Sequence, residues 1–223
     1  MISFTLWEFL TTFLVYANAD LAQMTVFSSQ LDTEKTLSTL FASNARVVIL
    51  RIFLIDPLRA YYQRQLEQAT GLAIRAVQRE LERLVSIGFL FRHVEGNRTY
   101  HQVDMDFPLY PELRDIILKA GSDFDRLRSR LAVNPAIRLA FLNAGASRVL
   151  VVLKAGQSGQ VEAPPYTVEV VASATFVAWL GEKNAALQPF LVDGVDLLGR
   201  RDDVIWRRIE ASGYSVTKGD GIP

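Results

Sequence analysis

Arginines are the residues of this sequence whose type and spacing could act on a charged partner. Residues 44–103 hold nine arginines against five acidic residues, although the whole chain balances 24 cations with 24 acids. Residues 1–43 hold one lysine and four acids, and residues 134–211 hold eight of each sign. The planar guanidinium forms two parallel hydrogen bonds with a phosphate or a guanine edge. This arginine block therefore predicts a surface that binds phosphate.

Polar side chains in this block share one face of a predicted helix at 74–87. Apolar residues recur there at helical spacing, from Ile74 through Val77 to Val85. The opposite face carries Arg75, Gln78 and Arg79, with Arg83 one turn later. Glutamine can pair with adenine and arginine with guanine in the DNA major groove. The alternative is that this Arg/Glu-rich face is only solvated, because Glu80 and Glu82 interleave with the arginines.

The segments around this helix predict a winged helix-turn-helix. Ser43 is a suitable N-cap for a helix at 44–54, and a second helix at 60–70 ends at Gly71. Two strands at 89–94 and 99–103 flank the turn 95–98 and form the wing, 89–103. Such a fold presents one helix to the major groove and brings the wing to the adjacent backbone or minor groove. Winged helices also serve as protein-interaction modules, which is the main alternative.

The run YYQRQLEQATGLAIRAVQRELERLVSIGFLFRHVEGNRTYHQV resembles the DNA-binding domain of ArsR-type transcriptional regulators. The similar motifs are Gln65-Leu66, Thr70-Gly71-Leu72, residues 76–81, Leu84, Gly88 and Gly96-Asn97-Arg98-x-Tyr100. The resemblance implies that helix 74–87 reads the major groove and that the protein acts as a homodimer. Residues 106–113 resemble the linker of the subgroup in which this domain precedes a minimal nucleotidyltransferase domain.

The candidate DNA-binding residues lie on the second and third helices and on the wing. They are Arg64, Gln65, Arg75, Gln78, Arg79, Arg83, Arg92, Asn97 and Arg98. Metal-sensing ArsR-type members use cysteines, and this chain has none. His93 and His101, the only histidines, fall near each other across the wing, where two ligands make a poor site. We expect no metal site and no cofactor.

The second half predicts a small α/β domain behind a linker helix. Residues 111–131 read as a helix interrupted at Gly121-Ser122, whose apolar stripe forms a dimer contact or packs inside its own chain. Strands are expected at 136–143, 148–153, 166–171 and 192–198. Helices are expected at 174–180 with Ser173 as cap, at 184–191 and at 201–209. The expected fold class is α+β, a winged helix-turn-helix domain followed by this α/β domain.

The tail of the second half, residues 168–209, resembles the minimal nucleotidyltransferase fold. In that family a Gly-Ser turn holds the nucleotide phosphates, and an Asp-x-Asp pair binds Mg²⁺. Here the expected turn reads Asn143-Ala-Gly-Ala-Ser-Arg148, and the strand after it carries no carboxylate. Asp104-x-Asp106 and Asp123-x-Asp125 fall in the linker. The simplest interpretation is a degenerate domain without catalysis.

Other catalytic arrangements are also poorly represented. Without cysteine there is no thiolate nucleophile, and both histidines fall in the wing, away from a pocket in the second half. The sequence contains neither G-x-x-x-x-G-K-[ST] nor G-x-G-x-x-G. We therefore predict a DNA-binding transcriptional regulator rather than an enzyme. A residual nucleotidyltransferase and a protein-interaction module are the alternatives.

Residues 1–20 are strongly apolar, but Glu8 interrupts them and they lack the basic start of a secretory signal. We interpret them as an extension before a start at Met24 or as a helix that docks on apolar surface. A dimerisation or membrane-surface helix is the alternative.

The expected division is an extension at 1–35, a DNA-binding domain at 36–105, a linker at 106–133, a nucleotidyltransferase-like domain at 134–211 and a tail at 212–223. The expected partners are double-stranded DNA, a second copy and an unidentified small-molecule effector, in the cytoplasm and without a membrane.

Overall fold

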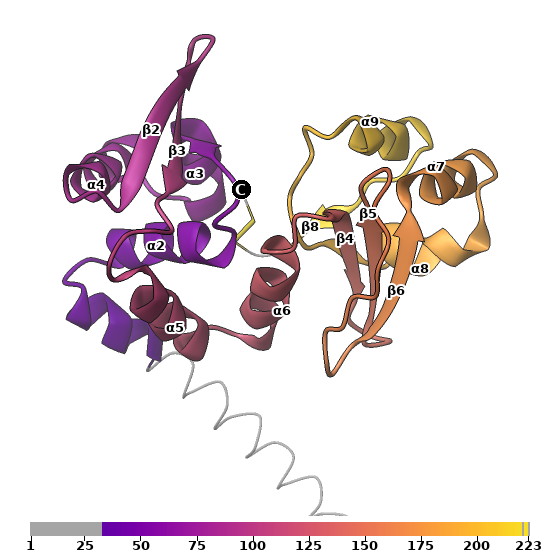
Figure 1. Cartoon of the computed structure of the whole chain (residues 1–223), viewed down its shortest axis with the longest axis horizontal. Coiled ribbons are helices and arrows are strands. Elements are labelled where there is room, and N and C mark those ends of the chain that lie inside the picture. The colour runs from indigo at the N-terminus through magenta and orange to yellow at the C-terminus, as the bar shows by residue number, and fades with distance from the viewer. Residues whose placement is uncertain (1–32, 220, 223) are drawn as a thin grey trace, which may run out of the picture.

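The computed structural model describes residues 33–219 and 221–222. The chain is α+β, as predicted, and consists of two units side by side (Figure 1). We call residues 33–120 the first unit, which contains a three-stranded sheet. Residues 137–219 are the second unit, which contains a five-stranded sheet. The predictions of a docking or dimerisation helix and of a start at Met24 lie outside the described residues.

The first unit places three helices against a small antiparallel sheet. Strand β1 pairs with β3 and β3 pairs with β2, so the sheet order is β1-β3-β2. The elements in chain order are α2 (Asn44–Ile55), β1 (Tyr61–Tyr62), α3 (Gln63–Thr70), α4 (Ile74–Ser86), β2 (Leu90–Glu95) and β3 (Arg98–Val103). Strands β2 and β3 form the hairpin predicted from the sequence.

The helix ends of the first unit follow local sequence signals. The Ser43 hydroxyl accepts a hydrogen bond from the Arg46 amide, which confirms the predicted N-cap. Gly71 ends α3 with a φ of 65°, a conformation that glycine adopts without a Cβ penalty. The predicted helix at 60–70 instead begins at Gln63, because Tyr61 and Tyr62 pair with His101 and Tyr100 of β3.

The core of the first unit is built around α2. Seven residues of α2 are buried, among them Ile49, Phe53 and Leu54 with no measurable exposure. They pack with Leu66 of α3 and Val77 of α4. Within the described part of the chain, no single helix is long and apolar enough to cross a membrane. The helix Thr33–Leu40 and α2 meet that test of length and composition only as a pair, bent by 105°.

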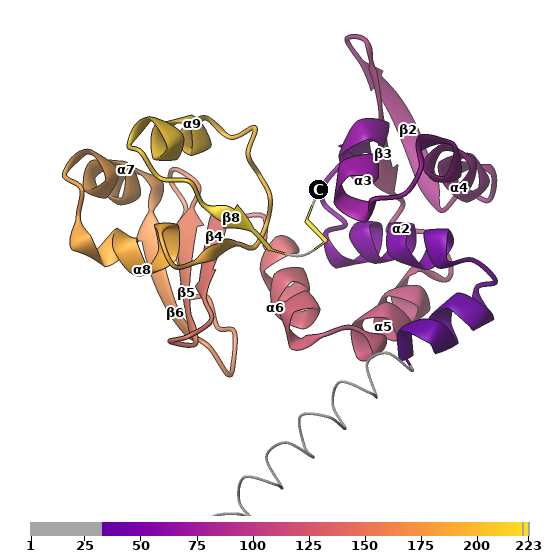
Figure 2. The ribbon, with the colours of Figure 1, turned by 180° about the vertical axis from the view of Figure 1, so that it is seen from behind.

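Two helices lead from the first unit to the second, the last helix of the first unit and the helix that follows it. They are α5 (Tyr110–Ala120) and α6 (Asp123–Ala132), and Gly121-Ser122 separates them as predicted. Both views show α6 between the units (Figures 1 and 2). Ile117 of α5 packs in the first core, whereas Leu127 and Leu131 of α6 pack against the second sheet. The predicted apolar stripe is thus mostly used inside its own chain.

The second unit is a mixed sheet in the order β6-β5-β4-β7-β8. Strands β5 and β6 are parallel, as are β7 and β8, whereas β4 is antiparallel to both of its neighbours. The strands are β4 (Ile137–Asn143), β5 (Arg148–Leu153), β6 (Thr167–Ala172), β7 (Val195–Asp196) and β8 (Thr217–Lys218). The helices are α7 (Ser173–Gly181), α8 (Gln188–Leu191), preceded by the 3-10 turn η1 (Ala185–Leu187), and α9 (Val204–Ala211).

Both faces of this sheet are covered. Phe141 and Val152 pack with Phe176 of α7 and Trp206 of α9, whereas the alternate residues, such as Val151, face α6. A strand buried on both faces has a continuous apolar sequence, which explains the run Val-Leu-Val-Val-Leu in β5.

Several element boundaries in the second unit differ from the predictions. Ser173 is the first helical residue of α7 rather than its cap, and its hydroxyl donates to the Leu153 carbonyl. The strand predicted at 192–198 is only two residues long, because the Asp196 carboxylate accepts from the Leu198 and Gly199 amides and turns the chain. The last helix begins at Val204, since Asp203 caps it.

Candidate nucleic-acid interface

Helix α4 presents a polar face opposite its core-facing side. Val77 and Leu81 are buried in the first core. Arg75, Gln78 and Arg79 are exposed, as predicted from their spacing. Within the described residues, none of these three side chains has a hydrogen-bond or ion-pair partner. Their donors are therefore free to meet an external acceptor.

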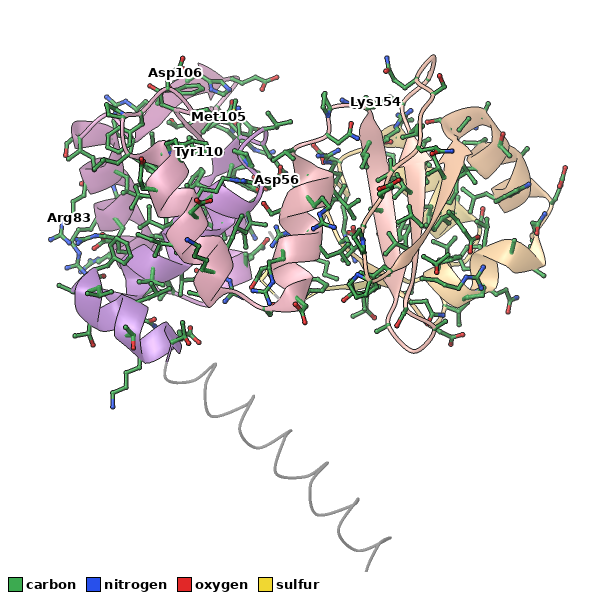
Figure 3. All side chains as sticks on the ribbon, turned by 60° about the horizontal axis from the view of Figure 1, so that its bottom comes forward. Asp56, Arg83, Met105, Asp106, Tyr110 and Lys154 are labelled. Atoms are coloured by element: carbon green, nitrogen blue, oxygen red, sulfur yellow. The ribbon has the colours of Figure 1, made fainter. Side chains whose placement is uncertain are left out.

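Arg83, on the same helix, is held differently. Its Nη1 lies 2.7 Å from Glu80 Oε1, and Glu80 Oε2 accepts from Arg46 Nε at 3.0 Å. Glu80 is 2% exposed and Arg83 is 55% exposed. Figure 3 shows Arg83 on the side of the first unit that faces away from the second. Arg83 thus reaches solvent but is partly neutralised, unlike Arg75 and Arg79.

The hairpin carries three further candidates. Arg92 on β2, Asn97 in the turn and Arg98 on β3 are all exposed. The Arg98 guanidinium carbon lies 4.7 Å from the centroid of the Tyr62 ring, a cation–π geometry. A hydrogen bond to Tyr100 raises the pKa of Arg98, so this side chain stays a cation. The hairpin therefore adds positive charge beside α3.

Helix α3 carries two of the candidate DNA-binding residues, an arginine without a partner and a glutamine whose side chain stabilises the helix start. Arg64 is exposed, whereas Gln65 is half-buried. The Gln65 Oε1 accepts from the Tyr62 amide at 3.1 Å and so fixes the start of α3. Of the two predicted residues on this helix, only Arg64 is unengaged within the described structure.

The two histidines of the hairpin are not arranged as metal ligands. In the register of β2 and β3, Arg92 lies opposite His101 and His93 lies opposite Tyr100. The His93 and Tyr100 rings stack with centroids 5.5 Å apart. Burial, aided by the positive charge of Arg92, lowers the pKa of His101. Among the described residues, no three His, Cys, Asp or Glu side chains form a group that could hold a metal ion.

The acidic pairs of the linker have structural partners. The Asp104 carboxylate accepts from the Asp106 amide at 3.0 Å and closes a turn. Asp125 accepts from both the amide and the hydroxyl of Ser122, and it also forms an ion pair with Arg51 of α2. The Asp125 carboxylate therefore caps α6 and links this helix to the first unit.

The turn between β4 and β5 lacks the parts of a phosphate site. The Asn143 side chain accepts from the Ala146 amide at 3.1 Å, and Ser147 closes the turn with a φ of 50°. Arg148, the first residue of β5, pairs with Glu169 of β6. The Glu169 carboxylate on the neighbouring strand is thus engaged by an arginine.

Sequence reasoning missed a group of cations where the two units meet. Arg59, Arg138, Lys154 and Arg200 line a cavity of about 670 Å³ together with Arg98 of the hairpin. Lys154 follows the end of β5 in the second unit (Figure 3). These residues are dispersed along the chain, so no local spacing signals that they lie together. Only the packing of the two units brings them to one place.

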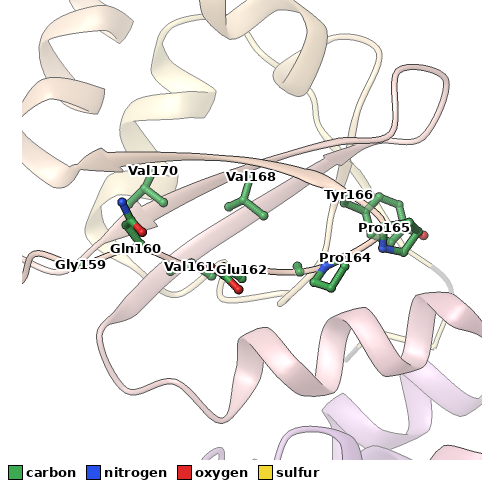
Figure 4. Close-up of a pocket in the computed structure, with 10 residues that line it drawn as sticks. Gly159, Gln160, Val161, Glu162, Pro164, Pro165, Tyr166, Val168 and Val170 are labelled. Atoms are coloured by element: carbon green, nitrogen blue, oxygen red, sulfur yellow. The ribbon is translucent and has the colours of Figure 1, made fainter.

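A second cavity, of about 590 Å³, lies in the second unit between β6 and the segment 159–166 (Figure 4). Its lining is mainly valine, proline and alanine, and Glu162 is its only charged residue. A binding site for a small molecule usually adds several convergent polar groups to an apolar wall. This cavity offers no comparable set, so it is not a candidate active site.

No protein-family model matches this chain, and no curated protein sequence matches it.

Proposed function

We propose that this protein is a sequence-specific DNA-binding transcriptional regulator whose first unit is a winged helix-turn-helix. The observation that carries the proposal is the exposed, unpartnered set Arg75, Gln78 and Arg79 on one face of a helix fixed in a core. An α-helix, with a diameter of about 10 Å including side chains, fits the major groove of DNA. The hairpin beside α4 brings Arg92 and Arg98 to the DNA backbone or minor groove.

The remaining parts of the proposal follow from this function. We propose a homodimer, because the resemblance to ArsR-type regulators implies one and two-fold symmetric operators match dimeric readers. We propose a cytoplasmic location for the same regulator. The second unit is proposed as a degenerate nucleotidyltransferase-like domain, since β5 carries no carboxylate and Arg148 engages Glu169. Mg²⁺-dependent labelling by a radioactive nucleotide would overturn the absence of catalysis.

The first experiment is fluorescence anisotropy with the chain's own upstream region and with a random duplex, across a salt series. We expect tighter binding to the upstream region and a steep loss of affinity with salt, because released counterions drive phosphate contacts. Absence of binding to both duplexes at low salt would overturn the proposal.

Two variants separate base reading from phosphate contact. Arg79→Ala is expected to weaken specific binding by about 1–3 kcal/mol, whereas Arg98→Ala is expected mainly to reduce the salt slope by about one. Arg207→Ala is the matched control, because Arg207 is an exposed arginine of α9 in the second unit. Equal binding by Arg79→Ala and the control would remove α4 as the reading helix.

A protein-interaction module is the second candidate, and one observation favours it. Phe91 and Val94 of β2 are exposed by 46% and 71%, so this strand offers apolar surface that contacts with phosphate would not use. A partner captured through this strand would bind with little salt dependence. Phe91→Ser should then abolish partner binding and leave duplex binding intact.

A further inference from the structure

The cavity between the two units has the size and the shared walls of a small-molecule site. Its volume of about 670 Å³ lies within the range common for ligand pockets, which is roughly 300–1,000 Å³. One wall comes from the first unit, with Tyr62, Gln65 and Arg98, and the other comes from the second unit, with Lys154 and Arg200. A molecule bound here would contact both units.

The charges that line this cavity do not balance. Five cations line it, namely Arg59, Arg98, Arg138, Lys154 and Arg200, against the two acids Asp202 and Asp203. Asp203 pairs with Arg138 at 2.7 Å, and Asp202 lies 4.0 Å from Arg59. Within the described residues, Arg98 and Lys154 have no carboxylate partner, whereas Arg200 interacts with the buried Asp56. Five cations against two acids leave three positive charges in excess around one cavity.

The buried charges behind this wall do not offset the excess. Asp56 is fully buried and interacts with Arg59, Arg128 and Arg200. Arg128 is itself 1% exposed, so Asp56 and Arg128 together add no net negative charge behind the wall, whether Asp56 is ionised or protonated. Like charges in a partly desolvated cavity repel one another, and a bound anion relieves that repulsion.

We propose that this junction cavity binds a small phosphate-bearing anion with at least two negative charges, and that this anion is the effector of the regulator. Four of its five cations are arginines, whose guanidinium fork matches a phosphate oxygen pair. The cavity is concave and is shared by two units, and Arg75, Gln78 and Arg79 do not line it. A small molecule therefore fits it better than the convex backbone of a duplex.

The role of the anion as an effector rests on the proposed DNA-binding function. Binding of the anion to the cavity does not depend on that function. Arg98 is common to the cavity and to the hairpin that we assign to DNA, and Tyr62 and Tyr100 contact both. A phosphate that engages Arg98 withdraws it from the duplex. Anion and DNA should therefore weaken each other's binding by the same factor.

The test of binding is isothermal titration of the full chain with inorganic pyrophosphate, without DNA. We expect saturable binding that Lys154→Ala weakens by about tenfold, the effect of one charge-assisted hydrogen bond. Lys154 is exposed and its side chain has no partner among the described residues, so its loss leaves the fold intact. Lys119→Ala is the matched control, an exposed lysine of α5 outside the cavity. Absence of saturable binding, or an equal loss in both variants, would overturn the proposal.

The test of coupling is anisotropy of the duplex complex with and without pyrophosphate at constant ionic strength. We expect pyrophosphate to lower duplex affinity for the parent protein and to have about tenfold less effect on Lys154→Ala. If Lys154→Ala weakens duplex binding and pyrophosphate does not bind, the cavity belongs to the duplex interface and the small-anion proposal is wrong. If pyrophosphate binds and no duplex does, the cavity proposal stands and the DNA-binding proposal fails.

Discussion

At the scale of single residues, the arginines of the first unit divide by their partners. Arg75 and Arg79 have none among the described residues, whereas Arg46 and Arg83 share the buried Glu80. All four lie in one charge-rich block of sequence, so their types alone do not separate them. An arginine without a partner can donate its hydrogen bonds to a ligand. An arginine in an ion pair already uses its donors to stabilise the fold.

Glu80 is therefore expected to act through stability rather than through DNA. Glu80→Ala should lower the free energy of unfolding by about 1–3 kcal/mol, because both arginines lose a charged acceptor. Glu82→Ala, an exposed neighbour on the same helix, should change it by no more than about 0.5 kcal/mol. Urea unfolding of both variants checks this, and equal stability of the two would contradict the role assigned to Glu80.

At the scale of elements, the ends of helices decide where the polar face of α4 points. Ile87 caps α4, and Gly88 then takes a φ of 77° so that Phe89 can enter the core and start the hairpin. A side chain at Gly88 would meet no atom within 4 Å, so backbone strain is the only cost of adding one. The orientation of the hairpin relative to α4 thus depends on one left-handed residue.

Gly88→Ala should lower the free energy of unfolding by about 1 kcal/mol, because a Cβ disfavours a positive φ. Gly181→Ala is the matched control, since Gly181 ends α7 with ordinary helical geometry and open space around it. That change should raise stability by about 0.4–1 kcal/mol. Thermal or urea unfolding measures both, and a loss of the same size in both variants would argue against strain at Gly88.

At the scale of the whole molecule, buried charge marks the place where the units meet. Asp56, at the end of α2, is fully buried, and neither carboxylate oxygen has a hydrogen-bond partner among the described residues. Burial raises the pKa of Asp56 above 3.8, although Arg200, Arg128 and Arg59 partly oppose the rise. The folded protein therefore holds the Asp56 proton more tightly than the unfolded chain does.

The sign of the pH dependence follows from this difference. With a higher pKa in the folded state, the contribution of Asp56 to stability is fully present below pH 3.8 and is lost as the pH rises through the folded-state pKa. Asp56→Asn mimics the protonated group, so it should gain stability relative to the parent as pH rises. Urea unfolding across the acidic range measures this. Asp193→Asn, which changes an exposed carboxyl, is the control, and a pH-independent difference for Asp56→Asn would contradict the prediction.

The sequence by itself determined the elements that local chemistry controls. Ser43 and Gly71 fix helix ends through hydrogen bonds and backbone freedom within a few residues, and the apolar spacing of α4 predicts its exposed face. Pairings between distant segments were not predictable in this way. Tyr61 and Tyr62 were predicted to be helical, because nothing near them in the sequence reveals that they pair with β3, about 40 residues later.

Tertiary structure alone decided the charge environment of the junction. Arg59 and Asp202 are far apart in sequence, and Arg98 lies on β3 whereas Lys154 follows β5 of the other sheet, yet all four line one cavity. Uneven charge along the chain indicated only the arginine block at 44–103, because residues 134–211 are neutral in sum. Electrostatic interaction depends on distance in space and on burial, and sequence spacing reports neither for residues on separate elements.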